Sequence, residues 1–264
     1  MLNVFYTKYI MSLFRKAVNA SQYLPSSIFR KVAVNTAGSL FKKAPYVKDN
    51  PTGATLAKAS YLVGEKGKSP EAIAETNKMV ASTGFELVPD LSNRQISTFK
   101  NKEGNYTIAH KGTCLSCPSN YKDIKTDLAL SLGFNTKQVK NRTKRTEEIL
   151  DMIDQRNPDA KVNMTGHSLG GHTSSYAMAK SKKVRDRINK ASTFNTGSNP
   201  FLNAGLNVDK DTRKTLDNKV VNYRKRNDII SAGLITNPQF GKTKTYSNNL
   251  LTNPLKAHEI EQFI

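Results

Sequence analysis

The feature that most constrains this chain is a serine between two glycines, placed where a short apolar alternation gives way to small residues. Residues 166–170 have the sequence Gly-His-Ser-Leu-Gly. Before them, Val162 and Met164 alternate with polar neighbours, which predicts a strand over 160–165. After them, small residues predict a helix over 170–179 that packs closely on a sheet. A strand, a sharp turn with a serine and a helix form a nucleophile elbow, in which the strained turn exposes the serine hydroxyl. A glycine-rich turn without chemistry is the alternative.

An elbow serine needs a general base, and the small number of histidines in the chain leaves few candidates for it. In an elbow of this kind the order along the chain is serine, acid, histidine. The chain has four histidines, and only His258 lies well downstream of Ser168. His167 is inside the turn, His172 is on the first turn of the following helix, and His110 precedes the serine in a predicted strand. We therefore expect His258 to be the general base, with a surface histidine in a C-terminal helix as the alternative.

The acid that orients the base is expected at Asp228. Residues 219–223 predict a strand, and the polar stretch that follows ends at Asp228. An open α/β sheet places its functional groups just beyond the carboxyl ends of its strands. The alternative is a surface charge paired with the basic residues at 224–226.

Two backbone N–H groups are expected to form an oxyanion hole. Ester hydrolysis develops negative charge on the carbonyl oxygen, and the residue after the nucleophile, here Leu169, supplies one donor. Residues 95–100 and 106–110 predict a hairpin with Gly104 in its turn. The second strand runs into a Lys-Gly-Thr segment, so Thr113 is the expected second donor.

Together these motifs resemble the class 3 lipases, a branch of the α/β-hydrolases, over roughly residues 70 to 264. The resemblance implies a central, mostly parallel sheet flanked by helices. It also implies that Ser168 is the nucleophile, Asp228 the acid and His258 the base, with Thr113 and Leu169 in the oxyanion hole. One departure is Lys111, which stands where the family usually has an arginine. The segments that carry the resemblance are Lys111-Gly112-Thr113, Gly166-His167-Ser168-Leu169-Gly170-Gly171, Thr193-Phe194-Asn195-Thr196-Gly197, Asp228-Ile229-Ile230 and His258.

By this resemblance the chain is expected to be a serine carboxylic-ester hydrolase that acts on lipids through an acyl-enzyme, as a lipase or phospholipase at a membrane interface. That chemistry requires no cofactor and no metal. The alternative, from another class, is a non-catalytic protein that keeps the hydrolase scaffold. Such a protein would bind a membrane, nucleic acid or a larger assembly through its basic surface.

A formal net charge of +20, from 41 basic and 21 acidic residues, favours anionic partners. Anionic phospholipid and nucleic acid are both candidates. The basic runs lack the interleaved aromatic residues on which bases stack, so a membrane surface is favoured over nucleic acid. No apolar run approaches the roughly 18 to 20 residues of a membrane-spanning helix.

The N-terminal part of the chain differs from the rest in composition. Residues 1–48 contain no acidic residue, and their apolar side chains recur at helical spacing. A membrane-surface helix is favoured, with a transit peptide or an arm docked on another protein as alternatives. We expect a basic, partly helical arm over 1–60 and the hydrolase domain over 61–264. Within that domain, Ser69 precedes a proline and predicts the start of a helix over 72–80.

Two further segments leave alternatives open. Cys114 and Cys117 are the only cysteines, and they are expected to be two reduced thiols or one local disulfide. Residues 235–255 place apolar and aromatic residues among turn residues, which fits either a lid over the site or an ordinary connecting loop.

Overall fold

The computed structural model describes residues 50–113, 136–197, 208–226, 228, 231, 240–246 and 254–264. The chain divides into two units, Met1–Pro45 and Tyr46–Ile264, and every described residue belongs to the second. The basic arm up to residue 49 lies outside the described residues, as do Cys114 and Cys117. The expectations for these parts of the chain therefore stay predictions.

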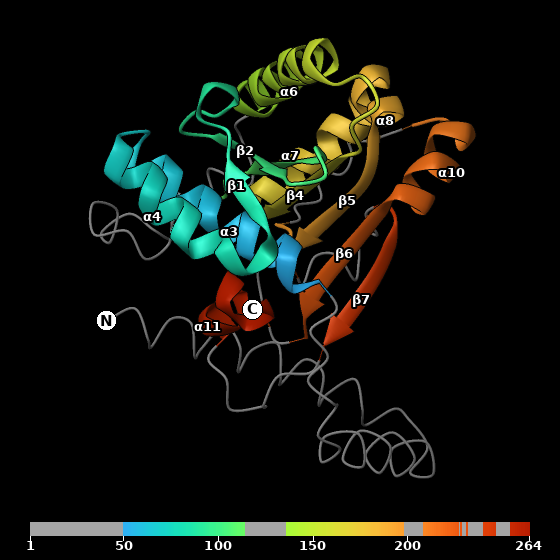
Figure 1. The fold of residues 1–264 in the computed structure, drawn as a ribbon. Helices are drawn as coiled ribbons and strands as arrows, with labels where there is room; N and C mark the ends of the chain where they lie inside the picture. The colour runs from blue at the N-terminus through green and yellow to red at the C-terminus, as the bar shows by residue number, and fades with distance from the viewer. Residues whose placement is uncertain are drawn as a thin grey trace, which may run out of the picture. The chain divides into compact units, whose positions relative to one another are not determined.

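A seven-stranded sheet forms the centre of the second unit, and its strands lie side by side in chain order (Figure 1). The first two pairings, β1 with β2 and β2 with β3, are antiparallel. Every pairing from β3 to β7 is parallel. The mostly parallel α/β-hydrolase sheet expected from the sequence is thus confirmed. The strands are β1 (Phe85–Leu87), β2 (Ile96–Asn101), β3 (Tyr106–His110), β4 (Val162–His167), β5 (Ile188–Phe194), β6 (Val220–Lys225) and β7 (Lys242–Tyr246).

Helices cover both faces of this sheet (Figure 1). On one face α3 packs on β2, β3 and β4, and α4 packs on α3. On the other face α7 packs on β3, β4 and β5, with α6 and α8 beside it and α10 over β5 and β6. The helices are α3 (Pro51–Lys66), α4 (Pro70–Val80), α6 (Thr136–Arg156), α7 (Leu169–Lys180), α8 (Lys182–Arg187), α10 (Lys210–Lys219) and α11 (Pro254–His258), with 3-10 turns η1 (Ala81–Thr83), η2 (Pro89–Leu91) and η5 (Ile260–Phe263).

Residues in β3 show how the strand alternation builds two cores. Ile108 is buried with Ile149 of α6 on one side of the sheet. Its neighbour Ala109 is buried with Leu56 of α3 and with Phe99 on the other side. Successive side chains of a strand point to opposite faces, so a strand covered by helices on both faces is apolar on both.

The first described helix, α3, belongs to the hydrolase unit and spans residue 60, where the sequence suggested a domain boundary. It begins after Asn50, whose side chain accepts a hydrogen bond from the amide of Gly53 at 2.9 Å, and Pro51 occupies its first turn. A capping side chain with a proline directly after it is a strong helix start. The C-terminal turn η5 packs on this helix, because Ile260 and Phe263 share a buried cluster with Ala54 and Ala57.

Other local predictions have mixed outcomes. The hairpin of β2 and β3 forms as expected, with Gly104 at φ 79° in its turn. Helix α4 starts after Ser69, whose hydroxyl accepts from the amide of Ala72. Within 235–255, where a lid or a loop was expected, residues 242–246 form the edge strand β7. Residues 235–239 and 247–253 lie outside the described residues, so the choice between a lid and a loop stays open there. Among the described residues, no helix combines the length and the apolar character that crossing a membrane requires.

Candidate active site

The predicted elbow forms between β4 and α7. Strand β4 ends at His167, α7 begins at Leu169, and Ser168 between them has φ 55° and ψ −123°. A positive φ is strained for a residue with a side chain, and it persists where the surroundings fix it. Here the amide of Ser168 donates to the Phe194 carbonyl at 3.0 Å, and its own carbonyl accepts from the amide of His172 at 3.1 Å. The turn is thus held from β5 on one side and from the first turn of α7 on the other.

Glycine is required on both sides of this serine. A Cβ atom at Gly166 would lie 2.4 Å from the carbonyl group of Gly170. One at Gly170 would lie 2.0 Å from the carbonyl oxygen of His110 in β3. Both separations are far below van der Waals contact, so only glycine lets β3, β4 and α7 approach this closely.

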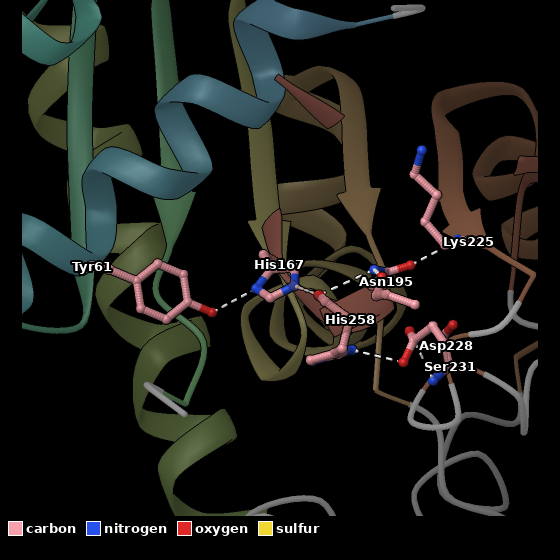
Figure 2. Close-up of polar contacts among 8 residues, drawn as sticks. Tyr61, His167, Asn195, Lys225, Asp228, Ser231 and His258 are labelled. Carbon is pink, nitrogen blue, oxygen red and sulfur yellow. Dashed lines mark hydrogen bonds and ion pairs between the residues drawn. The ribbon is translucent and has the colours of Figure 1, made fainter. Parts of the chain in front are cut away.

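The candidate base and acid are in direct contact. His258 Nδ1 donates to Asp228 Oδ1 at 3.0 Å, and both side chains are fully buried (Figure 2). The other carboxylate oxygen of Asp228 accepts from the backbone amide of Ser231 at 3.2 Å. Neither residue is the surface group that was the alternative for it. Because Nδ1 carries the proton given to the carboxylate, the lone pair of neutral His258 is on Nε2.

Several buried polar atoms lack a hydrogen-bond partner among the described residues, including Ser231 Oγ beside Asp228. Two of them are Ser168 Oγ and His258 Nε2. No hydrogen bond joins them in this structure. A buried polar atom without a partner is costly and needs an explanation, and a catalytic role is one such explanation. Catalytic hydrogen bonds are often loose in the absence of substrate, and they tighten when it binds.

The backbone of His258 is held as well as its ring. Its carbonyl oxygen accepts from His167 Nε2 at 2.6 Å and from Asn195 Nδ2 at 3.1 Å (Figure 2). The hydroxyl of Tyr61 in α3 lies 2.7 Å from His167 Nδ1. Burial, with a smaller effect of nearby His258, lowers the pKa of His167 to about 3, so its ring is neutral. Both ring nitrogens of His167 have partners, the His258 carbonyl and the Tyr61 hydroxyl.

The segment with the expected oxyanion donor runs directly beside the elbow. A Cβ at Gly112 would lie 2.5 Å from the carbonyl oxygen of His167, so Thr113 follows immediately after this close approach. From α6, buried Arg142 donates to the carbonyl of Lys111 at 2.5 Å and anchors the start of the segment. Burial lowers the pKa of Arg142 to about 10. The guanidinium of Arg142 in α6 therefore contacts this segment, although position 111, where the family usually has an arginine, holds a lysine.

A cavity of about 220 Å³ opens beside these groups. Thr113, His167 and His258 line it together with apolar and charged side chains from α3, α4 and the C-terminal segment. Those further lining residues are Lys58, Tyr61, Leu62, Glu65, Met79, Glu259, Ile260 and Glu261. A concave site with an apolar wall and a few polar groups is typical of a small-molecule pocket.

Sequence reasoning missed Tyr61 and Asn195. Nothing in the sequence around Tyr61 distinguishes it from a core residue of α3. Asn195 stood within a segment that carries the family resemblance, and a non-glycine residue just after a strand could have been suspected of a left-handed conformation. Its φ is in fact 39°.

The sheet, its helices and the strained serine turn define an α/β-hydrolase. A family model described as phospholipase-like, a Tle-like phospholipase domain, matches residues 52–239. That match spans well over half of the chain. The chain therefore belongs to the Tle-like phospholipase family, within the class 3 lipase-like group, and is a lipase- or phospholipase-like carboxylic-ester hydrolase.

Solved structures with a similar fold include lipases from Rhizopus and Yarrowia. Lipase II from Rhizopus niveus is 16% identical, with a TM-score of 0.48, and the match covers 75% of this chain and 78% of that one. The lipase from Rhizopus microsporus var. chinensis is 15% identical, with a TM-score of 0.49 and coverage of 74% and 72%. The Lip2 lipase from Yarrowia lipolytica is 17% identical, with a TM-score of 0.46 and coverage of 79% and 80%. A comparison with curated proteins gives no match.

Proposed function

We propose that Ser168, His258 and Asp228 form a catalytic triad that hydrolyses a carboxylic ester of a lipid. The observation that carries the proposal is the buried hydrogen bond from His258 Nδ1 to Asp228, which leaves Nε2 without a partner among the described residues. That bond fixes the tautomer in which Nε2 accepts a proton. The strained turn at Ser168 and its own unpartnered hydroxyl support the assignment.

The proposed reaction uses the three residues in two stages. His258 Nε2 takes the proton of the Ser168 hydroxyl while Oγ attacks the acyl carbonyl carbon, and a tetrahedral intermediate forms. His258 then gives the proton to the departing alcohol, and the acyl group stays on Ser168. A water molecule then attacks the acyl carbonyl carbon while His258 takes its proton, and His258 returns that proton to Ser168 Oγ as the fatty acid leaves. Asp228 stays ionised and stabilises the imidazolium at both stages.

The developing oxyanion needs donors that are in place before the reaction. The backbone N–H of Leu169 is one, since it begins α7 directly after the serine. The backbone N–H of Thr113 is the other, since Gly112 brings its segment against the carbonyl of His167. Donors fixed in a buried site stabilise the transition state without reorganising, and one such donor contributes roughly 100- to 1000-fold in rate.

The cavity beside His258 suits an acyl ester with a polar head. Leu62, Met79 and Ile260 offer an apolar wall for the acyl chain. Lys58 and Glu261, which form an ion pair at 3.2 Å, line the same cavity and favour a polar group at that side. We propose a phospholipid as the substrate, which agrees with the phospholipase-like description of the family.

A membrane surface is the proposed place of action. The formal net charge of +20 attracts anionic headgroups and raises the local concentration of enzyme at such a surface. Full-length protein should co-sediment with vesicles that contain phosphatidylserine and not with vesicles of phosphatidylcholine alone. Binding to the first should weaken as salt rises, because salt screens surface charge. Equal binding to both kinds of vesicle would contradict the charge-driven attraction.

A fluorophosphonate probe tests the triad directly. We expect covalent labelling of folded wild-type protein, with the modified peptide containing Ser168 by mass spectrometry. Ser168→Ala should not be labelled. Ser175→Ala, which removes another buried hydroxyl of α7, is the matched control and should be labelled like wild type. Folded wild-type protein that is not labelled, or equal labelling of Ser168→Ala, would refute the proposal.

The substrate is tested by release of fatty acid from phospholipid vesicles and from a triacylglycerol emulsion. We expect faster release from the phospholipid, with Ser168→Ala inactive on both. Faster release from the emulsion would make the protein a neutral-lipid hydrolase while leaving the triad in place. Vesicle binding without any hydrolysis would instead favour the non-catalytic scaffold.

A further inference from the structure

The carbonyl oxygen of His258 accepts two side-chain hydrogen bonds, and both donors come from strand ends distant in sequence. His167 closes β4, and Asn195 follows β5 directly. Asn195 Nδ2 also donates to the Ala257 carbonyl at 2.8 Å. The helix that carries His258, α11, has five residues, too few to be stable alone. Its position therefore depends on contacts from outside it.

The direction of each hydrogen bond through His167 can be assigned. A carbonyl only accepts, so His167 Nε2 must carry the proton that it gives to His258. The ring is neutral at ordinary pH, because burial keeps its pKa near 3. Nδ1 is then an acceptor, and the hydroxyl of Tyr61 donates to it at 2.7 Å. A single chain of donors thus runs from α3 through β4 to the C-terminal segment.

Asn195 holds a backbone conformation that costs energy, and both polar atoms of its side chain make hydrogen bonds. Its φ of 39° lies in the left-handed region, where asparagine is better tolerated than most residues with a side chain. Its side-chain Oδ1 accepts from the backbone amide of Lys225 at 2.9 Å, and its backbone amide donates to the Tyr223 carbonyl at 2.8 Å. Asn195 therefore ties the end of β6, three residues before Asp228, to the backbone of His258 (Figure 2).

We propose that Asn195 and His167 are positioning residues, which hold the His258 backbone so that its imidazole stays between Asp228 and Ser168. Neither side chain touches the reacting atoms. Asn195 bonds the end of β6 through Oδ1 and the end of α11 through Nδ2, so the acid and the base keep their distance. This inference rests on the proposed triad.

The expected loss of rate follows from how little displacement of the reacting groups a catalytic site tolerates. A displacement of about 1 Å between reacting groups can cost on the order of 100-fold in rate. Loss of a group that orients a catalytic residue from behind has comparable consequences, about 10- to 100-fold where this has been measured at metal sites. The loss should fall on kcat and not on KM, because the cavity wall that binds the acyl chain is untouched.

The decisive variant is Asn195→Gly, since glycine adopts the same φ without strain and only the side-chain contacts are lost. We expect kcat and the rate of Ser168 labelling to fall about 10- to 100-fold, with KM changed less than threefold. The matched control is Asn189→Gly, an exposed asparagine at the other end of β5, which should keep wild-type activity. Thermal unfolding of each variant reports whether the fold is intact.

If Asn195→Gly does not fold, a pair of His167 variants tests the same inference. His167→Gln retains a side-chain N–H that can reach the His258 carbonyl, whereas His167→Leu has none. We expect His167→Gln to keep at least ten times the labelling rate of His167→Leu. A merely structural role predicts equal rates in variants of equal stability.

The outcomes separate this inference from the triad. Active, labelled wild type with an equally active Asn195→Gly, or equal rates for the two His167 variants, would overturn the positioning role and leave the triad standing. Folded wild type that neither labels nor hydrolyses would overturn the triad and this inference with it.

Discussion

The two halves of the candidate site are built in different ways. The serine half is continuous in the chain: β4, the turn at Ser168 and α7 follow one another, and glycine contacts fix their spacing. The histidine half is assembled from separate segments. Asp228 follows β6, His258 ends α11, and side chains from β4 and β5 hold the latter in place.

This difference predicts different kinds of failure. In the serine half, backbones are in contact, so an added methyl group should disturb the fold itself. In the histidine half, side chains are joined by hydrogen bonds, so isosteric changes should disturb chemistry before stability. Four substitutions, ordered by the size of the expected effect, test this contrast.

The largest effect is expected from Asp228→Asn. The amide keeps the shape of the carboxylate but favours the wrong tautomer of His258, and in serine proteases the same change lowers kcat by about 10⁴-fold. We expect a loss of that order in ester hydrolysis. Exposed Asp159→Asn is the control and should be fully active. An Asp228→Asn variant within tenfold of wild type would remove Asp228 from the triad.

Gly170→Ala should lower the free energy of unfolding by about 3 kcal/mol or more. The new Cβ would meet the carbonyl oxygen of His110 at 2.0 Å, and a backbone cannot give way as a flexible side chain does. Gly84→Ala is the matched comparison, because its φ of 74° is strained for alanine but nothing lies near its Cβ. It should cost only about 1 kcal/mol. Urea denaturation measures both, and equal losses would contradict the steric account.

Acid should destabilise the protein mainly through buried histidines in and beside the serine half. His167 and His172 belong to this half, and His110 of β3 contacts it through Ser174 of α7. Burial lowers the pKa values of His110, His167 and His172 to about 3, 3 and 4. Below about pH 6.5 the unfolded chain binds protons that the folded chain excludes, so stability falls as the pH falls toward 4. Each such histidine contributes up to about 1.4 kcal/mol per pH unit.

Replacement of one of these histidines tests the acid effect. His172→Phe removes a ring whose Nδ1 has no partner among the described residues, and it keeps most of the buried volume. The free energy of unfolding, measured in urea between pH 6.5 and 4.5, should fall with pH less steeply than in wild type, by about 1.4 kcal/mol per pH unit. An unchanged slope would mean that His172 is protonated in the folded state.

The same contrast explains what could be predicted from the sequence. The elbow, the hairpin and the capped start of α4 depend on neighbouring residues, and all three are confirmed. Strand β7 was missed, because alternating lysine and threonine give an edge strand no apolar signal. Lysine on an edge strand discourages pairing with other chains, so its polarity has a structural reason.

The contacts that hold the histidine half together could not be predicted from any local sequence pattern. Asp228 was chosen for its place after a strand, but its bond to His258 joins residues 30 positions apart. His167 and His258 are 91 positions apart, and Tyr61 reaches His167 across 106. Such contacts follow from the order of strands in the sheet, which the periodicity of single segments does not specify.

The smallest effect is expected from Tyr61→Phe, which removes the hydrogen bond from α3 to His167. His167 Nδ1 would lose its donor inside the protein, at a cost of about 1 to 2 kcal/mol in unfolding free energy. The labelling rate of Ser168 should fall by no more than about threefold, because the bond from His167 to the His258 carbonyl remains. Tyr176→Phe on α7, at a partly exposed ring, is the control. A loss of labelling as large as that of Asp228→Asn would mean that α3, and not the strand ends, sets the position of the base.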